Sequence, residues 1–402
     1  MLSRRLLIAG GGGSFSTASE FTVTAAPDGA WPGGLGGQPF YYAGTTYFGF
    51  ADNSGGIRVG TFVHATGTVV TTTVASTSTD QHNRAALVRR VSDGRFVTAY
   101  SNHDTASFYY RVSTNPDDLT AWDTEVSLHA LVGGTAYTYP FLFRLGSTYY
   151  LFYRDNDGLS NWEISTSSDG EAWSAFTNLV YGTRAYARAF KSSETRFDVV
   201  VTDGSYAEDY ASLYHFYCES GSYYTSDGSS IAGSPPFAFS SLTKIYDGAT
   251  AGVRYPAGHA KVGSEIAVVF PVQTGTPSGH IGEDEDYLYA RWNGATWSTH
   301  TVAAAVGATD FEYTEGSLAV DPADLDRVVL SKRVAGVWQV HIYTTTDNGV
   351  TWSIRQISDS VDPNIYPEFV NDHALGLQFV WLTGTFTTQS VYDSGIQGYG
   401  TA

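Results

Sequence analysis

Two histidines, a tyrosine and an arginine stand at matching places in two successive segments of the chain. His82 lies in the run DQHNR, and His103 follows 21 residues later in SNHD. Tyr139 lies in YTYP, and Arg154 follows 15 residues later in YRD. An imidazole or a phenol can accept and return a proton, and a guanidinium can neutralise a carboxylate. Together, these four side chains could transfer protons on an acidic substrate.

Each of the four residues also has an ordinary structural interpretation. A histidine in a loop at a strand end is usually solvated or hydrogen-bonded, and Tyr139 is one of 28 tyrosines that could simply pack. Arg154 precedes Asp155 and could form a surface ion pair that contributes little to stability. The shared placement of the residues in two successive segments is what favours a common function.

The segments around these residues are typical of antiparallel β-structure. From about residue 39 onward, β-branched and aromatic runs alternate with Gly, Asp, Asn and Ser every 8 to 14 residues, and helical periodicity is almost absent. Many runs are apolar at nearly every residue, so we expect sheets that are covered on both faces. The expected strands include 40–42, 46–50, 58–63, 96–100, 108–112, 149–153, 197–201, 266–270, 287–292 and 328–330.

A longer repeat divides the strands into groups. The run TTDNGVTW ends at Trp352, a shorter copy, SSDGEAW, ends at Trp173, and eroded copies surround Asp227, Asn293 and Asp117. The anchors at 117, 169, 227, 293 and 347 are separated by 52, 58, 66 and 54 residues. In the complete motif the Asp can cap its own hairpin, the Gly can take a positive φ and the Trp can pack on neighbouring strands. Such a period predicts a β-propeller with four-stranded blades of about 50 residues.

The strand groups predict an all-β, seven-bladed β-propeller that forms a single domain over residues 21–402, with six blades as the alternative. The seventh group shows only three strands, and residues 21–24 could supply its outer strand and so close the ring. The expected blades span 39–74, 83–128, 137–179, 184–226, 252–303, 312–358 and 365–393.

Composition and charge narrow the range of partners. The 402 residues include 22 Lys and Arg against 40 Asp and Glu, which gives a net charge of −18. A surface this acidic repels phosphate backbones, so we expect no nucleic-acid partner. An acidic polysaccharide could bind only where several cations converge in one cleft. The single cysteine, Cys218, excludes an intrachain disulfide and a zinc site built from several thiolates.

The length of the hydrophobic runs indicates whether the chain could span a membrane or carry a secretory signal. None approaches the roughly 18 to 20 residues of a membrane span, so we expect a soluble protein without a membrane partner. Residues 1–20 contain an apolar run shorter than the roughly 7 to 15 residues of a secretory signal. We expect a flexible or assembly-related tail there, with a weak signal-like segment as the alternative. We also expect a monomer that acts outside the cell, with a virion-associated location as the alternative.

The motifs around the four residues resemble those of the Asp-box, or neuraminidase-repeat, propeller family that includes the ulvan lyases. The resemblance is most specific in the His-to-His and Tyr-to-Arg segments, 80–103 and 138–154, and it continues through 313–321 and the final Asp box. It extends over most of residues 39–390. It implies a seven-bladed propeller that cleaves an acidic, uronate-containing polysaccharide by β-elimination.

The resemblance also implies a role for each residue. Tyr139 and His82 would act as acid and base on the uronate, while Arg154 and His103 would bind its carboxylate. We expect nearby cations to lower the pKa of the Tyr139 phenol, so that it could take the C5 proton and return it to the leaving oxygen. The step needs no metal or redox cofactor, and it is compatible with a structural cation that the sequence does not locate. The remaining expected substrate-binding residues are His259, Arg254 and Asn83.

Two other functions stay open at this point. An exo-sialidase also carries Asp boxes, but it needs three arginines around a carboxylate and usually an Arg-Ile-Pro run, which this chain lacks. A non-catalytic glycan-binding propeller, as in a phage tail or an adhesin, would use the exposed faces of Tyr and Trp. The sialidase candidates would be Arg154, Arg188 and Arg254, with Tyr313 or Tyr366 as nucleophile and Glu315 or Glu368 behind it.

Overall fold

The computed structural model describes most of the chain. The described residues are 20–32, 34–132, 134–156, 161–180, 182, 184–204, 211–273, 285–305, 317–373 and 376–401. The tail predicted for residues 1–20 therefore lies outside the described residues, apart from Glu20. No helix in the described ranges is long and apolar enough to span a bilayer.

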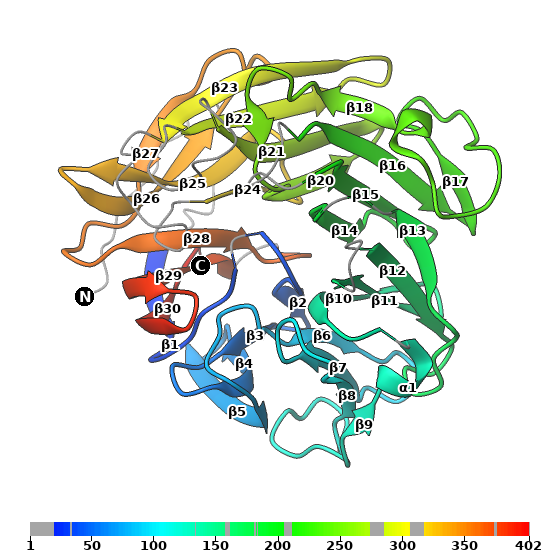
Figure 1. Ribbon diagram of the computed structural model, residues 1–402. Coiled ribbons are helices and arrows are strands. Elements are labelled where there is room, and N and C mark those ends of the chain that lie inside the picture. Colours follow the sequence, from blue (N-terminus) through cyan, green and yellow to red (C-terminus); the bar gives the residue numbers. More distant parts are fainter. Residues whose placement is uncertain are drawn as a thin grey trace, which may run out of the picture.

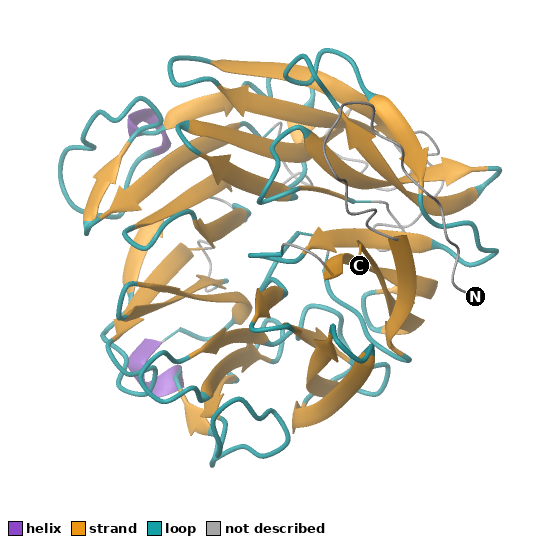
Figure 2. Ribbon diagram, turned by 180° about the vertical axis from the view of Figure 1, so that it is seen from behind, coloured by secondary structure: helices purple, strands orange, loops and turns teal. Residues whose placement is uncertain are grey.

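Seven antiparallel sheets form a ring of blades around a central axis (Figures 1 and 2). Blade one contains β2 (Phe40–Tyr42), β3 (Thr45–Ala51), β4 (Gly56–Val63) and β5 (Thr68–Ser76). Blade two contains β6 (Ala86–Arg89), β7 (Phe96–Ser101), β8 (Phe108–Val112) and β9 (Val126–Ser127), followed by α1 (His129–Val132). Blade three contains β10 (Tyr137–Leu145), β11 (Thr148–Asp155), β12 (Asn161–Ser167) and β13 (Thr177–Val180).

Blades four and five have one extra strand each, and blade six has four strands. Blade four contains β14 (Ala187–Lys191), β15 (Arg196–Thr202), β16 (Leu213–Glu219) and β17 (Ser222–Tyr224), with η1 (Phe239–Ser241) and β18 (Thr243–Tyr246) after them. In blade five, β19 (Gly252–Val253) and β20 (Gly258–Val262) both pair with β21 (Glu265–Gln273), which continues into β22 (Glu285–Trp292) and β23 (Trp297–Ala305). Blade six contains β24 (Leu318–Val320), β25 (Arg327–Val334), β26 (Val337–Thr344) and β27 (Ser353–Gln356).

The seventh blade joins the two ends of the chain. Its inner strands are β28 (Asn364–Phe369), β29 (Gly376–Thr388) and β30 (Val391–Thr401), and its outer strand is β1 (Glu20–Ala26). β1 pairs antiparallel with β30, with Glu20 opposite Thr401. The prediction of a seven-bladed propeller closed by an N-terminal strand is confirmed, and the six-bladed alternative is wrong.

The core lies between neighbouring blades, where apolar residues on both faces of each sheet meet. Aromatic pairs connect adjacent blades, as between Phe108 and Tyr153, whose ring centroids are 4.8 Å apart. Phe143 and Phe197 make a similar contact at 5.5 Å between blades three and four. Because each blade buries apolar area against two neighbours, a closed ring leaves no blade face unpartnered.

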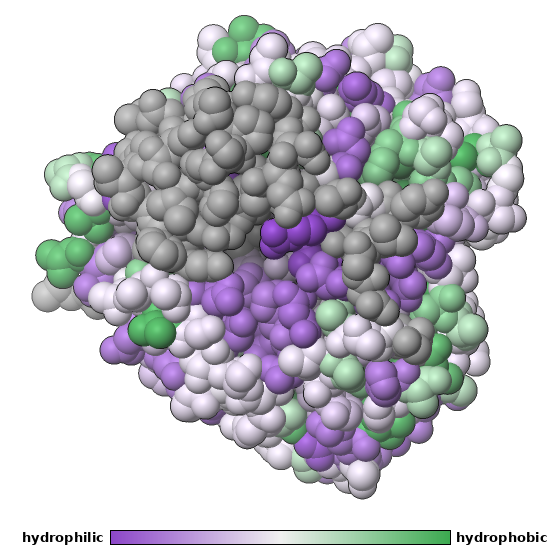
Figure 3. Space-filling model, in the orientation of Figure 1, coloured by the Kyte–Doolittle hydropathy of each residue, from purple (hydrophilic) through white to green (hydrophobic). Residues whose placement is uncertain are grey.

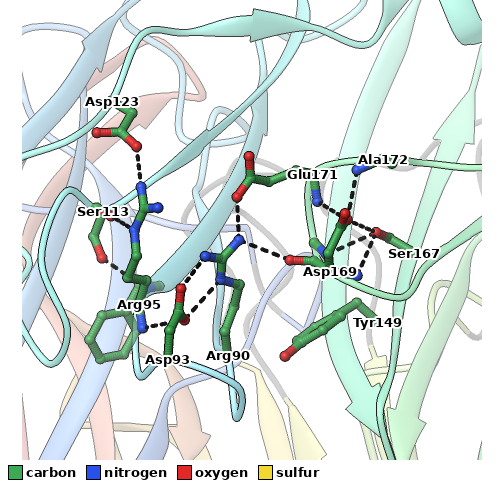
Figure 4. A network of polar contacts seen from close by, with 12 residues as sticks. Arg90, Asp93, Arg95, Ser113, Asp123, Tyr149, Ser167, Asp169, Glu171 and Ala172 are labelled. Atoms are coloured by element: carbon green, nitrogen blue, oxygen red, sulfur yellow. Dashed lines mark hydrogen bonds and ion pairs between the residues drawn. The ribbon is translucent and has the colours of Figure 1, made fainter.

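The Asp boxes connect the third and fourth strands of a blade and also contact the preceding blade. Asp169 Oδ1 accepts hydrogen bonds from the backbone N–H groups of Glu171 and Ala172, both at 2.8 Å. Arg90 of blade two donates to the carbonyl of Asp169 at 3.0 Å and pairs with Glu171 (Figure 4). The box therefore holds its own hairpin and fixes the angle between two blades.

One eroded box uses a different residue from the one the sequence indicates. In blade two, Asp118 Oδ1 accepts the hydrogen bond from the backbone N–H of Thr120 at 2.8 Å. Asp117 instead has a φ of 52° and forms an ion pair with Arg89 at 2.6 Å. The turn thus places Asp117 in the left-handed conformation and leaves the capping role to its neighbour.

Replacing Gly349 by alanine should lower the stability of the protein by more than the strain of its left-handed backbone alone. Its φ is 94°, and a Cβ there would lie 2.6 Å from the ring of Tyr289 in blade five. Gly294 has a φ of 96° with open space around it, so it is a matched control. We expect Gly294→Ala to cost about 1 kcal/mol from backbone strain, and Gly349→Ala to cost roughly 1 to 3 kcal/mol more from overpacking. Equal losses in denaturant unfolding would contradict the packing role of the box.

Candidate active site

A carboxylate holds the two imidazoles of blade two side by side. Asp80 and His82 lie in the loop before β6, and His103 follows β7. Nδ1 of His82 donates to Asp80 Oδ1 at 2.6 Å, and Nδ1 of His103 donates to Asp80 Oδ2 at 3.1 Å. The two rings stack with their centroids 4.1 Å apart. Because both Nδ1 atoms face the Asp80 carboxylate, chemistry would use the Nε2 side of each ring, and Nε2 of His103 also lies 3.5 Å from Asp104 Oδ2.

Asn83 holds the loop that carries these histidines. Its Oδ1 accepts a hydrogen bond from the backbone N–H of His103 at 2.6 Å. Its Nδ2 donates to the hydroxyl of Thr77 and to the carbonyl of Ser78. Asn83 is buried, and both ends of its amide serve the loop, so the structure gives it a positioning role beside the imidazoles.

Tyr139 sits at a β-bulge near the start of β10. Its φ is 55°, and the pairing of β10 with β11 shifts register between Thr138 and Phe141. The Tyr139 ring lies 5.5 Å from the ring of His82 and 6.0 Å from that of His103, measured between centroids. Tyr366 in β28 has a φ of 53° at a similar register shift. The strained backbone is therefore a feature of two inner strands, and it is the contacts of Tyr139 that distinguish it.

Arg154 lies at the end of β11 between two tyrosine rings. Its guanidinium carbon is 4.8 Å from the centroid of Tyr139 and 4.9 Å from that of Tyr186. The residue is only 2% exposed. Its Nε and Nη1 are buried without a hydrogen-bond acceptor among the described residues. A buried cation without a counter-charge is costly, so the position is suited to an anionic ligand.

Burial determines the protonation states of Tyr139 and His82. Burial raises the pKa of the Tyr139 phenol well above its usual value, and the adjacent Arg154 offsets only part of that shift. The expectation that cations lower this pKa overall is therefore wrong, because desolvation outweighs them. Burial also lowers the pKa of His82, with a further lowering from His103, against the opposing effect of Asp80. At neutral pH, Tyr139 is a phenol that can donate a proton and His82 is a neutral imidazole that can accept one.

The triad of Asp80, His82 and His103 is a candidate site for the structural cation that the sequence allows. The ligand atoms of Asp80, His82 and His103 lie within 4.8 Å of one another and could hold a metal ion. Each imidazole already donates a hydrogen bond to the Asp80 carboxylate. These two hydrogen bonds help to hold the pKa of Asp80 below its usual range, although burial alone would raise it. We interpret the triad as a hydrogen-bonded network that orients the imidazoles.

Two of the expected substrate-binding residues lie outside this cluster. His259 is buried in β20, where its ring meets the ring of Phe190 at 3.9 Å. Burial, together with the charge of Arg188, holds its pKa well below the usual value. Arg254 lies between β19 and β20 and forms a buried ion pair with Glu285. The structure thus brings together His82, His103, Tyr139, Arg154 and Asn83, but neither His259 nor Arg254.

Sequence reasoning missed Tyr186, whose ring packs on Arg154. Tyr186 directly precedes β14, the inner strand of blade four, just as Tyr139 lies near the start of the inner strand of blade three. Its backbone N–H donates to the hydroxyl of Thr202 at 2.9 Å. The signal that could have found it is its position in the next blade, which continues the sector formed by blades two and three.

The residues considered for a sialidase have other partners. Arg188 is buried and donates to the carbonyl of Gly34 near the axis. Glu368 forms a buried ion pair with Arg84 at 2.7 Å. Tyr313 and Glu315 lie outside the described residues.

Hydrophilic residues gather near the middle of the face seen in Figure 3, which has the orientation of Figure 1. In Figure 1, strands β6 and β10 lie side by side on the inner wall of the ring. The inner strands of blades two, three and four thus bring their first residues toward one sector near the axis.

Comparison with known proteins identifies a family and a fold. The family described as "BNR repeat-containing family member" matches residues 45–305. Among curated proteins, none matches the chain. A polysaccharide lyase PL25 ulvan lyase bound to -[GlcA(1-4)Rha3S]- superposes with a TM-score of 0.74 at 13% identity, over 94% of this chain and 95% of that one. Polysaccharide lyase Uly1 superposes with a TM-score of 0.63 at 10% identity, over 95% of this chain and 98% of that one. The resemblance to Asp-box propellers is confirmed, and these likenesses show a shared fold.

The lowered pKa of His82 should make folding sensitive to acid. Below about pH 6.5 the unfolded histidine takes up a proton that the folded one resists, so stability falls as the pH falls. We expect His82→Gln to flatten this dependence between pH 8 and pH 5. Denaturant midpoints of the wild type and the variant over this pH range would measure the effect. Parallel curves for wild type and His82→Gln would show that His82 is not held neutral.

Proposed function

The chain belongs to the BNR repeat-containing family, and from that premise we propose that it is a polysaccharide lyase. The proposed reaction is β-elimination at a 4-linked uronate in an acidic, ulvan-like polysaccharide. The proposed partner is this polymer, met outside the cell by a monomeric enzyme.

The observation that carries the proposal is the buried guanidinium of Arg154 beside a phenol and an imidazole. A uronate carboxylate would supply the counter-charge that Arg154 lacks among the described residues. The same carboxylate would then lie next to the Tyr139 ring, which is 4.8 Å from the guanidinium carbon. Bringing a carboxylate, a phenol and an imidazole together is what an elimination at the adjacent carbon requires.

The proposed step uses the protonation states described above. His82 takes the proton from C5, and the electron pair of the C5–H bond forms the C4–C5 double bond. The bond between C4 and the leaving oxygen breaks, and Tyr139 donates its proton to that oxygen. Arg154 and His103 neutralise the carboxylate while charge flows onto it as an aci-carboxylate. Atoms and electrons balance without a metal or redox cofactor, so none is part of the proposed step.

The solved structures with this fold support the substrate class. One is an ulvan lyase bound to -[GlcA(1-4)Rha3S]-, a repeat with a uronate and a sulfated sugar. A uronate linked through the 4-position is the unit that β-elimination cleaves. We therefore propose a glucuronate-containing, sulfated polymer as the first substrate to test.

The proposal is tested by the ultraviolet absorbance of the conjugated 4,5-unsaturated uronate, a product that only elimination creates. We expect this absorbance to rise when the protein is incubated with ulvan. Saturable binding of ulvan without a rise would indicate a glycan-binding propeller. Release of free sialic acid from a sialoglycan, with no rise on any uronate polymer, would indicate a sialidase.

Removing one hydroxyl should test the role of Tyr139. Tyr139→Phe should lower turnover on the order of a hundredfold or more while it leaves polymer binding largely intact, because an acid group is lost and the ring remains. Tyr366→Phe removes the equivalent hydroxyl at the other bulge and should keep activity near that of the wild type. Full activity in Tyr139→Phe would show that the role assigned here is wrong.

Arg154 should contribute to substrate binding and turnover, and contribute little to the free energy of unfolding. Arg154→Ala should weaken polymer binding and turnover together, because the uronate carboxylate loses its partner. Arg84→Ala, which leaves Glu368 buried and unpaired, should lower stability by roughly 3 to 5 kcal/mol, and Arg154→Ala should cost far less. Kinetics and denaturant unfolding of both variants would measure this. An Arg154→Ala protein that binds and cleaves normally would exclude the carboxylate-binding role.

A further inference from the structure

A cavity lies at the ends of the inner strands that are opposite the candidate active site. It has a volume of about 580 Å³, within the range that holds a small-molecule or oligosaccharide ligand. Every blade contributes to its lining, through the final residues of the seven inner strands or the residues that follow them. We call it the axial pocket, and the residues used in the argument below are Tyr42, Arg89, Arg144, Lys191, Glu194 and Lys261.

The axial pocket and the candidate active site are at opposite ends of the axis. β10 carries Tyr139 near its start and Arg144 near its end. In blade four, Tyr186 precedes β14, and Lys191 is the last residue of that strand. Because the same strands run from one group to the other, the two sites face opposite sides of the ring.

A glycine-rich segment contacts three blades of the ring. The carbonyl of Gly34 accepts a hydrogen bond from Arg188 of blade four. A Cβ at Gly34 would lie 2.5 Å from the carbonyl of Ala257 in blade five, and one at Gly37 would lie 2.5 Å from Ala86 in blade two. Gly37 also lines the axial pocket, so this segment forms part of the pocket wall.

The charge of the axial pocket is opposite to that of the chain. Four basic residues line it, Arg89, Arg144, Lys191 and Lys261, against two carboxylates, Glu194 and Asp372. The whole chain has 22 basic and 40 acidic residues. A local excess of cations in so acidic a protein favours an anionic ligand at this place.

Arg89 is already paired with Asp117, which lies outside the pocket lining, but the other three cations leave positive charge available to a ligand. Arg144 and Lys191 share one carboxylate, that of Glu194, whose side chain is 60% exposed. Lys261 donates to the carbonyl of Gly263 and pairs with no carboxylate of the described residues. Because exposed ion pairs are weak, a ligand with several negative charges could replace Glu194 at little cost.

Aromatic side chains form another part of the pocket wall. Phe40, Tyr41 and Tyr42 of β2 all line the pocket. Tyr42 is partly exposed, and the guanidinium carbon of Arg89 lies 4.2 Å from its ring centroid. Aromatic rings beside cations offer an apolar face for a sugar ring and charges for its acidic groups.

We propose that the axial pocket binds an acidic oligosaccharide segment without cleaving it. The choice of a carbohydrate rests on the proposed function, whereas the preference for a negative charge rests on the pocket alone. Bound there, a polymer would be held on the face opposite the candidate active site, which would raise its local concentration.

Calorimetric titration of the Tyr139→Phe protein tests this proposal, because both sites can then hold intact ligand. The probe is the tetrasaccharide of two GlcA(1-4)Rha3S units, with cellotetraose as the neutral comparison. We expect two binding events for the acidic probe and none at the pocket for cellotetraose. Adding Lys191→Glu and Lys261→Glu should remove one event. Adding Lys244→Glu, at an exposed lysine of β18, should keep both.

Activity on long polymer gives a second readout. In the otherwise wild-type protein, Lys191→Glu with Lys261→Glu should raise KM for long polymer several-fold and leave kcat and the cleavage of the tetrasaccharide unchanged. Binding events that the double charge reversal leaves intact would overturn the proposal. If no unsaturated product forms in any assay but the reversal still removes a binding event, the proposed lyase function fails and the pocket stands.

Discussion

The architecture depends on the pairing of the first described strand with the last. When β1 adds to β30, the seventh sheet is completed and each blade is fixed between two neighbours. Only then do the first residues of consecutive inner strands converge, because each blade presents a few polar groups to the axis and no blade alone carries a site. His82 and His103 belong to one blade, Tyr139 and Arg154 to the next, and Tyr186 to a third. The Asp boxes support this arrangement from the periphery, since Asp169 and Glu171 accept hydrogen bonds from Arg90 of the preceding blade.

Much of this arrangement was readable from the sequence, because turn chemistry and strand periodicity are local. The boxes at 169 and 347 and the apolar runs between them gave the number of blades and placed 21–24 in the closing strand. The matching positions of His82 and Tyr139 in consecutive blades indicated that they share a sector. The rest depends on packing that no local pattern encodes. The pKa of Tyr139 follows from how much water the ring loses, and His259 meets Phe190 because of how blades four and five stack.

The candidate site brings several energetically unfavourable features together in one place. Tyr139 has a left-handed backbone, Arg154 is buried with unpartnered nitrogens, and His82 is kept neutral beside a carboxylate. Strain and unpaired charge of this kind persist only where the surrounding structure enforces them, and they tend to mark functional positions. Arg84 and Glu368, by comparison, form a buried ion pair, whereas Arg154 has no ion-pair partner among the described residues.

The glycine-rich segment near the axis also limits how a long substrate can move. Its backbone is hydrogen-bonded to Arg188, and Gly34 and Gly37 pack so closely on Ala257 and Ala86 that even a methyl group would clash. In the proposed lyase, this segment would keep a polymer from threading through the hub of the ring. A long chain would then reach the candidate active site sideways across its face, and uronates in the interior of the chain would be as accessible as those at its ends.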